Sequence, residues 1–310
     1  MMGGLFCYPA EKSYTLNNRK YTVSRLLGEG GFSFTGNREI SIFKKFDHPN
    51  ILRLIDHATI KSKTVPDAQE ILILMPFIKD GTLQDILDRQ RTVHGKECTT
   101  SVFNQRQSLT MFRQICEGIA QFHHSDPPLA HRDIKPGNVL LADSNNNNNN
   151  NNSSNSSSSS NKIPILMDFG STGPARLTVT SRKQALEIQE DADQHSTPLY
   201  RAPELFDVSS DCQLDERTDI WALGCLLYSM AFNKSPFESS SEDKSGSIAL
   251  SVISGQFEIP KSHSFSKELI DLIRSMLQLN IQDRPSIDHT QKTKKKKTVK
   301  SSTLANNNNR

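Results

Sequence analysis

The chain has 310 residues, of which 35% are hydrophobic, and a formal net charge of +3. This length suits one large domain or two modest ones, and the hydrophobic fraction lies below the globular average, which indicates that part of the chain is not packed. Seven of the 37 basic residues and no acidic residue lie between Gln291 and Arg310, so 30 basic residues face 34 acidic ones elsewhere. This mildly acidic remainder disfavours a domain that binds nucleic acid.

The cysteines and the hydropathy pattern exclude other classes. The five cysteines form no C-x-x-C pair, so neither a zinc site nor a disulfide framework is indicated and a reducing compartment is favoured. The longest apolar-rich run, from Trp221 to Phe232, is too short to span a bilayer. The first residues lack the charged start and long apolar core of a secretory signal. These features predict a cytoplasmic protein.

The first 20 residues are predicted to lie outside the fold, and two interpretations of them stay open. Gly3 becomes an acceptor for myristate if translation starts at Met2, and Cys7 can take palmitate. Two acyl chains would hold the protein on a membrane surface where one would not. Against this, Met1 precedes Met2, and Cys7 stands where the usual signal has Ser or Thr. The alternative is a disordered terminus without lipid.

A strand, a turn and a helix are predicted next. Tyr21 to Leu27 has the pattern of a strand, and the glycine-rich turn at residues 28–33 follows it. Glycines let backbone N–H groups close on phosphate oxygens, although such a turn by itself is more often a hairpin. Asn37 to Phe46 is predicted to be a helix with Glu39 in its first turn, ended by Pro49.

The next elements are strands and a helix. Ile51 to Ile55 and Ile71 to Met75 are apolar-rich runs of strand length. The run from Pro76 to Gly81 is predicted to be a connector, and Thr82 to cap a helix through Leu87. A buried helix follows, since apolar residues recur at helical spacing at Leu109, Phe112, Cys116, Ile119 and Phe122.

Two short strands are predicted at Val139 to Leu141 and at Ile165 to Met167. The chain between them includes Asn145 to Asn161, which is nothing but Asn and Ser. This tract cannot bury apolar surface, so we expect a disordered hairpin loop. Further on, Asp219 opens an apolar helix that reaches Phe232, and a later helix has an apolar stripe at Leu269, Leu272, Ile273, Met276 and Leu277.

The residues with the clearest chemistry flank the Asn/Ser tract. His131 to Asn138 contains an acid, a lysine and an amide, Asp133, Lys135 and Asn138, and Asp168-Phe169-Gly170 begins 30 positions after Asn138. A carboxylate and an amide that can share a divalent cation, beside a second carboxylate that can hold a hydroxyl, suit phosphoryl transfer. Asp-Phe-Gly alone often marks only a turn, so the indication lies in the two motifs together.

From Tyr21 to Pro285 the chain resembles the eukaryotic protein kinases, and within them the Numb-associated kinases. The motifs that carry this resemblance are the glycine turn at residues 28–33, His48–Leu54, His131–Asn138, Met167–Ser171, Tyr200–Phe206 and Asp215–Asp219. The resemblance implies an α+β, two-lobed protein kinase fold at residues 21–285. It also favours acylation of Gly3 and Cys7, because the members that the chain resembles most are acylated near their start.

The resemblance further implies the roles of the site residues. Asp133 would orient and deprotonate the substrate hydroxyl, Lys135 would neutralise the transferring phosphate, and Asn138 and Asp168 would hold magnesium. ATP would be bound by Leu27, Gly28, Gly30, Gly31, Met75, Phe77, Ile78 and Asp168. Thr197 would help to fix Asp133, Asp219 would brace the catalytic loop, and Glu204 would pair with Arg284.

The chain departs from the family between the turn and the helix. The family has two strands there, and the second carries a lysine that holds the α- and β-phosphates and pairs with the helix glutamate. Here only the five residues 34–38 separate the glycine turn from Glu39. An extended run of that length reaches about 17 Å, which allows one short strand but not two strands and a turn. Lys44 and Lys45 follow Glu39 by five and six positions, whereas helical partners sit three or four apart.

A second departure follows Pro285, where the family continues with an apolar helix. Residues 286–310 are predicted to be a basic disordered tail, which is either solvated or in contact with anionic lipid. The sequence therefore predicts a truncated small lobe and an inactive or severely impaired serine/threonine kinase-like protein that acts by binding. Two alternatives stay open: an active serine/threonine kinase that phosphorylates proteins, and a switch that binds magnesium-ATP without turnover.

Overall fold

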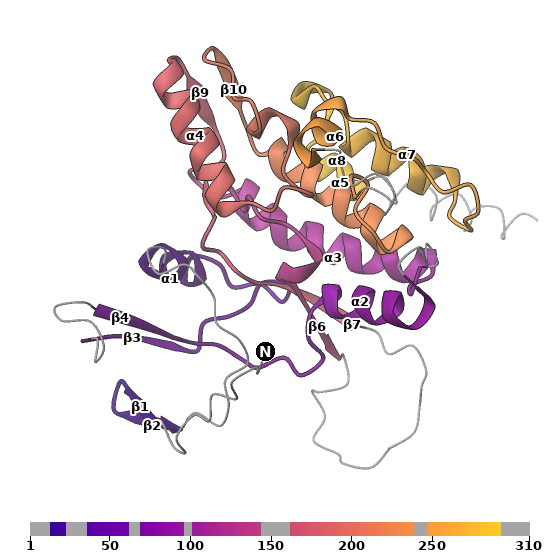
Figure 1. Cartoon of the computed structure of the whole chain (residues 1–310). Helices are drawn as coiled ribbons and strands as arrows, with labels where there is room; N and C mark the ends of the chain where they lie inside the picture. The colour runs from indigo at the N-terminus through magenta and orange to yellow at the C-terminus, as the bar shows by residue number, and fades with distance from the viewer. Residues whose placement is uncertain are drawn as a thin grey trace, which may run out of the picture.

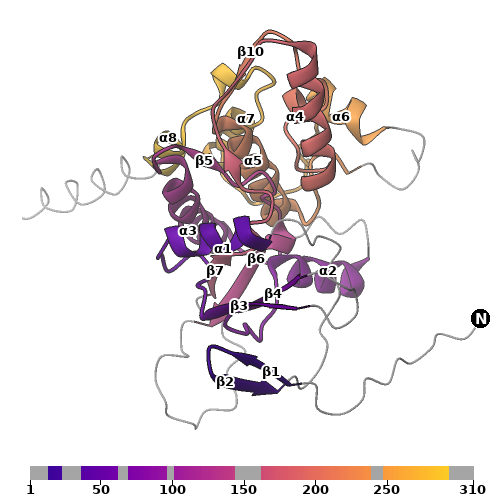
Figure 2. The same cartoon turned by 90° about the vertical axis from the view of Figure 1, so that its left-hand side faces the viewer.

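The computed structural model describes residues 13–22, 36–61, 69–95, 101–143, 162–238 and 247–292. Figures 1 and 2 show β1–β4 at one end of the molecule and α4–α8 at the other, with α1, α2 and the β6–β7 hairpin between them. The helices of the described part are α1 (Gly36–Lys45), α2 (Leu83–His94), α3 (Gln105–His123), α4 (Arg182–His195), α5 (Arg217–Phe232), α6 (Ile248–Ser254), α7 (Lys267–Met276) and α8 (Ile287–Lys292). The strands are β1 (Ser13–Leu16), β2 (Arg19–Thr22), β3 (Asp56–Lys61), β4 (Gln69–Leu74), β5 (Leu129–Ala130), β6 (Val139–Asp143), β7 (Lys162–Leu166), β8 (Gly173–Pro174), β9 (Leu177–Val179) and β10 (Cys212–Leu214).

The core is built around α3, α5 and α7. Helix α5 is apolar on all sides, and such a helix is stable only when it is buried; from Asp219 to Phe232 every residue is buried. The stripe predicted on α7 packs against it, with Leu269, Ile273 and Met276 buried. Gly224 allows this close approach, because a Cβ there would lie 2.9 Å from the Leu277 side chain.

The β6–β7 hairpin positions the two motifs of the sequence. Both predicted strands form, although β6 continues to Asp143 and β7 begins at Lys162 and ends at Leu166, one residue before the predicted end. They pair antiparallel with Val139 opposite Leu166. The Met167 N–H donates to the Asn138 carbonyl at 3.0 Å, so Asp168 begins beside the end of the His131–Asn138 loop. The Asn/Ser tract between the strands lies outside the described residues.

The first third of the chain differs from the prediction in several places, one of which is β3, a strand that was not predicted. Tyr21 and Thr22 belong to a strand, but it pairs with β1, which was not predicted; residues 23–27 lie outside the described part. The prediction of a strand at Ile51–Ile55 is wrong, because only an isolated bridge from Ile51 to Leu166 forms there. This run is apolar since Ile51 and Leu52 pack into the core, not because it pairs as a strand.

Other predicted elements are confirmed with shifted ends. Helix α1 begins one residue early and buries Ile40 and Phe43. Helix α2 has Thr82 as its N-cap, and it continues well past Leu87. Helix α3 carries the predicted apolar residues, with Ile119 and Phe122 fully buried.

Helix α4 was not predicted. It lies between Asp168 and Glu204, and Ser181 caps its start by accepting from the Gln184 N–H. Together with the β9–β10 pair it has a small core of its own, formed by Val179, Ala185, Val208 and Leu214. The chain between Asp168 and Leu214 is thus organised by a local core.

The described part of the predicted tail is helical. Ile287 of α8 is buried, and the Gln291 side chain donates to the Cys116 carbonyl at 3.0 Å. These contacts attach α8 to α3, which explains why the chain stays folded past Pro285. Within the described residues, none of the helices combines the length and the apolar character needed to cross a membrane.

Candidate active site

Asp133 is held from several sides. One carboxylate oxygen accepts from Lys135 Nζ at 2.6 Å and from Asn138 Nδ2 at 3.0 Å. The other accepts from the Thr197 N–H at 3.0 Å and from Thr197 Oγ1 at 2.8 Å. Lys135 Nζ also donates to Thr197 Oγ1 at 2.7 Å. The four residues therefore form one network that fixes the direction of the Asp133 carboxylate.

Asp219 of α5 supports the backbone of the His131–Asn138 loop. Its carboxylate accepts from the backbone N–H groups of His131 at 2.8 Å and Arg132 at 2.9 Å, and it lies 3.0 Å from His123 Nε2. Burial opposes the charge of Asp219, but the hydrogen bonds and the charges of His123 and His131 outweigh it and lower the pKa. The loop is strained as well, since Arg132 has a φ of 70°.

A third buried contact lies further into the helical part. Arg284 makes a two-pronged pair with Glu204, with both N–O distances at 2.7 Å. The Arg284 side chain is fully buried, and its guanidinium also donates to backbone carbonyls. These contacts match the bracing that the sequence predicts for Glu204, Arg284 and Asp219.

Asn138 and Asp168 suit a magnesium ion chemically. The Asn138 amide nitrogen donates to the Asp133 carbonyl at 2.8 Å as well as to its carboxylate, so the amide oxygen remains as a ligand. Asp168 has a φ of 62°. An amide oxygen and a carboxylate are the hard oxygen ligands that magnesium takes when phosphates supply the others. Asp133, Lys135, Asp168 and Thr197 line one pocket of about 290 Å³.

Helix α4 adds two residues to this pocket that the sequence did not predict, Gln194 and His195. Arg132 holds the end of α4 through an ion pair with Asp191 at 2.9 Å, and the His195 ring lies 3.1 Å from the same carboxylate. The signal that could have revealed the helix is the cap at Ser181 followed by small and apolar residues at helical spacing, Ala185, Ile188 and Ala192.

Glu39 of α1 has a different environment. Its carboxylate accepts from the Phe169 N–H, and its pKa is raised by burial and, secondly, by the nearby charge of Asp168. No cation of the described residues contributes to that pKa. Lys45 Nζ donates instead to the Asp126 carbonyl at 3.4 Å. This agrees with its position six residues after Glu39, since helical partners sit three or four residues apart.

The predicted ATP-binding residues are only partly described. Leu27, Gly28, Gly30 and Gly31 lie outside the described residues. Phe77 and Ile78 lie in the connector between β4 and α2, as expected, and Met75 lies there too, because β4 ends at Leu74, one residue before the predicted end of the strand. Met75 and Phe77 are exposed, so this surface is open to a ligand, and their contact with adenine stays a prediction.

Comparison with known proteins agrees with this geometry. The family model described as "Protein kinase domain" matches residues 21–294. A probable serine/threonine-protein kinase of Dictyostelium discoideum is 43% identical over 348 aligned positions, with 90% of this chain and 94% of the relative covered. Serine/threonine-protein kinase 16 of Rattus norvegicus is 34% identical over 313 positions, with 92% and 93% covered. Serine/threonine-protein kinase ENV7 of Saccharomyces cerevisiae is 25% identical, with 89% and 92% covered.

Proposed function

Because the chain belongs to the serine/threonine protein kinase family, we propose that it is a kinase-like protein with severely impaired phosphoryl transfer, which acts by binding. The chain has the protein kinase domain of the family, and we propose in addition that its small lobe is truncated. The observation that supports impaired transfer is the raised pKa of Glu39. A strand lysine paired with this carboxylate would lower its pKa, whereas burial and Asp168 raise it.

The cost of losing that lysine follows from the chemistry. Phosphoryl transfer depends on positioning and on fixed charges that stabilise the phosphates in the transition state. The loss of one such charge costs about 3 kcal/mol, or about a hundredfold in rate. The five residues 34–38 could form one short strand, but not the two strands and the turn that would supply such a charge.

The remaining residues would act as the family implies. Asp133 would accept the proton of a serine or threonine hydroxyl, and Lys135 would balance charge on the transferred group. Asn138 and Asp168 would hold magnesium, which when bound neutralises the phosphate oxygens. The network of Thr197, Lys135 and Asn138 keeps Asp133 oriented whether or not transfer occurs.

A kinase assay tests the proposal. The full chain with radiolabelled ATP, magnesium and a general protein substrate should incorporate phosphate at least about a hundredfold more slowly than the roughly 1–100 s⁻¹ of typical protein kinases, with the Asp133→Ala variant as the background. Incorporation by the wild type at a typical kinase rate that disappears in Asp133→Ala would overturn the impaired assignment. A parallel assay with manganese covers the case in which a different cation supports the reaction.

An active kinase is the second candidate, and two observations favour it. The catalytic loop is fully assembled around Asp133. The alignments with the first two relatives contain 348 and 313 positions, more than the 310 residues of this chain, so those relatives have stretches without a counterpart here. Sequencing the transcript between the codons of Phe34 and Glu39 separates the candidates, since additional codons there would restore the missing strands.

The third candidate is a nucleotide-binding switch, favoured by the fit of Asn138 and Asp168 to magnesium. A thermal shift with magnesium-ATP tests it. A rise in Tm that is lost in Asp168→Ala, without phosphate transfer, would support the switch. No shift at millimolar ATP would exclude it.

We further propose that the protein works in the cytoplasm, and that acyl chains on Gly3 and Cys7 bring it to a membrane surface. Both residues lie outside the described part, so the proposal rests on the sequence. Intact mass of the N-terminal peptide from the native host tests it. A peptide that begins with unmodified Met1 would reject the acylation.

A further inference from the structure

Lys162 holds two carboxylates that belong to different parts of the chain. It opens β7 directly after the Asn/Ser tract, and its Nζ lies 2.7 Å from Asp143 and 2.8 Å from Asp80. Burial opposes the charge of Lys162, but the hydrogen bonds to Asp143 and Asp80 outweigh it and raise the pKa. The ammonium therefore stays charged at neutral pH and bridges both carboxylates.

The two pairs differ in what they connect. Asp143 faces Lys162 across the β6–β7 hairpin, so this pair joins neighbouring strands that backbone hydrogen bonds already hold together. Asp80 lies 82 positions away in sequence, in the connector between β4 and α2. The pair with Asp80 therefore ties the connector to the hairpin.

The connector meets the hairpin at two further points. The Leu141 N–H donates to the Gly81 carbonyl at 3.0 Å, and Thr82 forms an isolated antiparallel bridge with Leu140. Gly81 has a φ of 79°, a conformation that favours glycine. Together with the Lys162–Asp80 pair, these contacts hold the last residues of the connector against the hairpin.

The same hairpin carries the residues that suit magnesium. Asn138 directly precedes β6 and Asp168 comes shortly after β7, so both lie at the end of the hairpin opposite to Lys162. The exposed side chains of Met75 and Phe77 in the connector form the predicted adenine surface. The hairpin is thus a common frame, with the candidate metal-binding residues at one end and the tie to the connector at the other.

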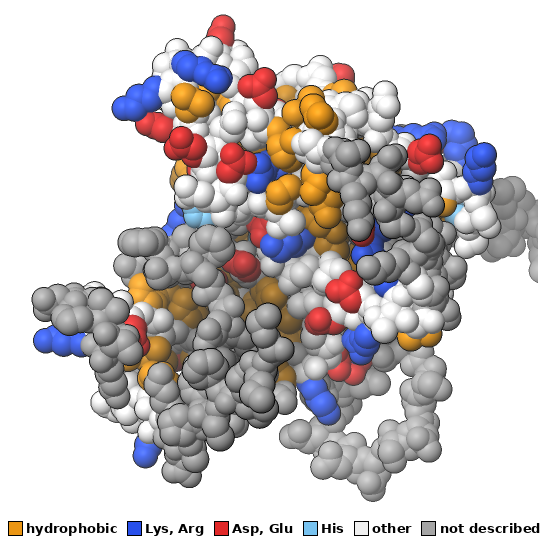
Figure 3. Space-filling view, viewed as in Figure 1, with side chains coloured by type: hydrophobic (Ala, Val, Ile, Leu, Met, Phe, Trp, Pro, Cys, Tyr) orange, Lys and Arg blue, Asp and Glu red, His pale blue; other side chains and the backbone are white. Residues whose placement is uncertain are grey.

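The Lys162–Asp80 pair lies on a surface of mixed charge. Figure 3 shows cationic and anionic side chains close together over the region that α2 and the β6–β7 hairpin occupy in Figure 1. The side chains of Lys162 and Asp80 are 22% and 30% exposed. A partly exposed pair adds little to stability, so its effect is expected on the position of the connector rather than on unfolding.

We propose that Lys162 is a positioning residue for the nucleotide. Its pair with Asp80 holds the connector against the β6–β7 hairpin, and this sets the distance of the adenine surface from Asn138 and Asp168. The inference rests on nucleotide binding at the proposed site, but it does not depend on phosphate transfer.

Equilibrium titrations of the full chain with magnesium-ATP and with adenosine test the inference. Lys162→Met should weaken both ligands by the same factor, about threefold, because the connector contacts the base that they share. Asp80→Asn should have the same effect, and the double variant should bind no more weakly than either single variant. Lys162→Arg should restore binding, since a guanidinium can also pair with Asp80.

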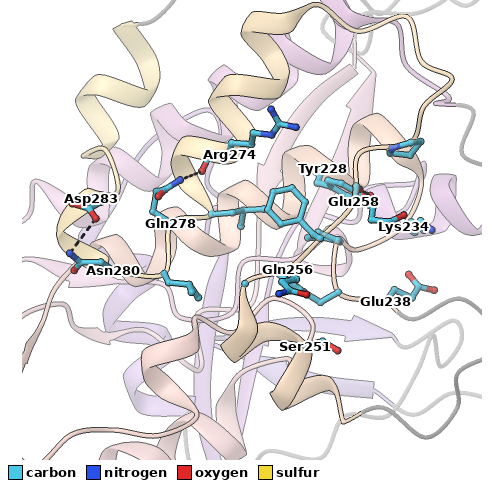
Figure 4. A pocket seen from close by; sticks show the side chains of 17 residues that line it. Tyr228, Lys234, Glu238, Ser251, Gln256, Glu258, Arg274, Gln278, Asn280 and Asp283 are labelled. Carbon is cyan, nitrogen blue, oxygen red and sulfur yellow. Dashed lines mark hydrogen bonds between the residues drawn. The ribbon is translucent and has the colours of Figure 1, made fainter.

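Two matched controls are available. Asp143→Asn removes the other carboxylate beside Lys162 and should leave binding unchanged, because Asp143 belongs to the hairpin. Lys234 is half-buried like Lys162, but it lies in the helical part on the wall of a hollow of about 1190 Å³, where Figure 4 shows it near Tyr228 and Glu238. Lys234→Met should therefore leave binding unchanged as well.

Amide hydrogen exchange of residues 77–82 in the ligand-free protein gives a second readout, and it should be faster in Lys162→Met and Asp80→Asn than in Asp143→Asn. A lowered Tm with unchanged affinity for both ligands would overturn the inference, because the pair would then only stabilise the fold. Weakening of magnesium-ATP alone would also contradict it. A wild type that binds neither ligand would overturn nucleotide binding and the inference together, whereas unchanged exchange in Lys162→Met would overturn the inference alone.

Discussion

Two carboxylates beside the candidate active site, Asp219 at the base of the catalytic loop and Glu39 of α1, have pKa values that are shifted in opposite directions. Asp219 is fully buried and has a lowered pKa, because three donors converge on it. Glu39 is half-buried and has a raised pKa, because Asp168 faces it and only one N–H offsets this. The contrast separates a buried carboxylate that is satisfied by its donors from one whose charge no cation of the described residues offsets. The following changes test it.

The largest effect is expected at the Glu204–Arg284 pair. Glu204→Ala leaves the fully buried guanidinium of Arg284 without its carboxylate, and an uncompensated buried charge costs about 4 kcal/mol. Urea denaturation measures the loss of unfolding free energy. The control is Glu216→Ala, whose partner Arg176 is 66% exposed and which should cost less than about 1 kcal/mol. Equal losses would show that burial does not distinguish the pairs.

Asp219→Asn is expected to cost about 2–3 kcal/mol at pH 7, because a single amide oxygen cannot accept from His131, Arg132 and His123 together. The pKa of Asp219 lies below its ordinary 3.8, so its contribution is present above that value and is lost as the pH falls through the folded-state pKa. Unfolding free energies from pH 7 downward should therefore converge for the two proteins only below pH 3.8. A gap that closes near neutral pH would contradict this origin.

The cap of α2, next to the exposed connector, should show an intermediate effect. Thr82 and Asp85 form a reciprocal capping box, and its loss in Thr82→Ala should cost about 1 kcal/mol. Thr92 on the same helix donates only to the Asp88 carbonyl, so Thr92→Ala should be nearly neutral. Thermal unfolding of both variants compares them directly.

The smallest effect, with the opposite sign, is expected at Glu39. Its folded-state pKa lies above the ordinary 4.5, so stability is highest below that value and is lost as the pH rises through the folded-state pKa. Glu39→Gln avoids this loss and keeps an oxygen for the Phe169 N–H. The variant should be slightly more stable at pH 7, by well under about 1 kcal/mol because the site is partly exposed, and equal to the wild type near pH 4. A destabilised variant at pH 7 would indicate a cation beside Glu39.

The sequence predicted much of the site because its chemistry is encoded in short motifs. Asp133, Lys135 and Asn138 lie within six positions, and their side chains meet in the structure. The helices around them were found from apolar spacing, as for Phe112 and Ile119 on α3. Helix α4 was not found because few of its residues are apolar. Its placement depends on Arg132 and on a small core with β9 and β10.

The sequence by itself determined which groups are present and which local stretches form most of the helices. Only the tertiary structure decided which groups meet: Asp219 reaches His131 across 88 positions, and Arg284 reaches Glu204 across 80. The reason is physical, since periodicity and capping act over a few residues, whereas the partner of a buried charge is chosen by packing of the whole chain. The same packing turned Glu39 toward Phe169 and Asp168.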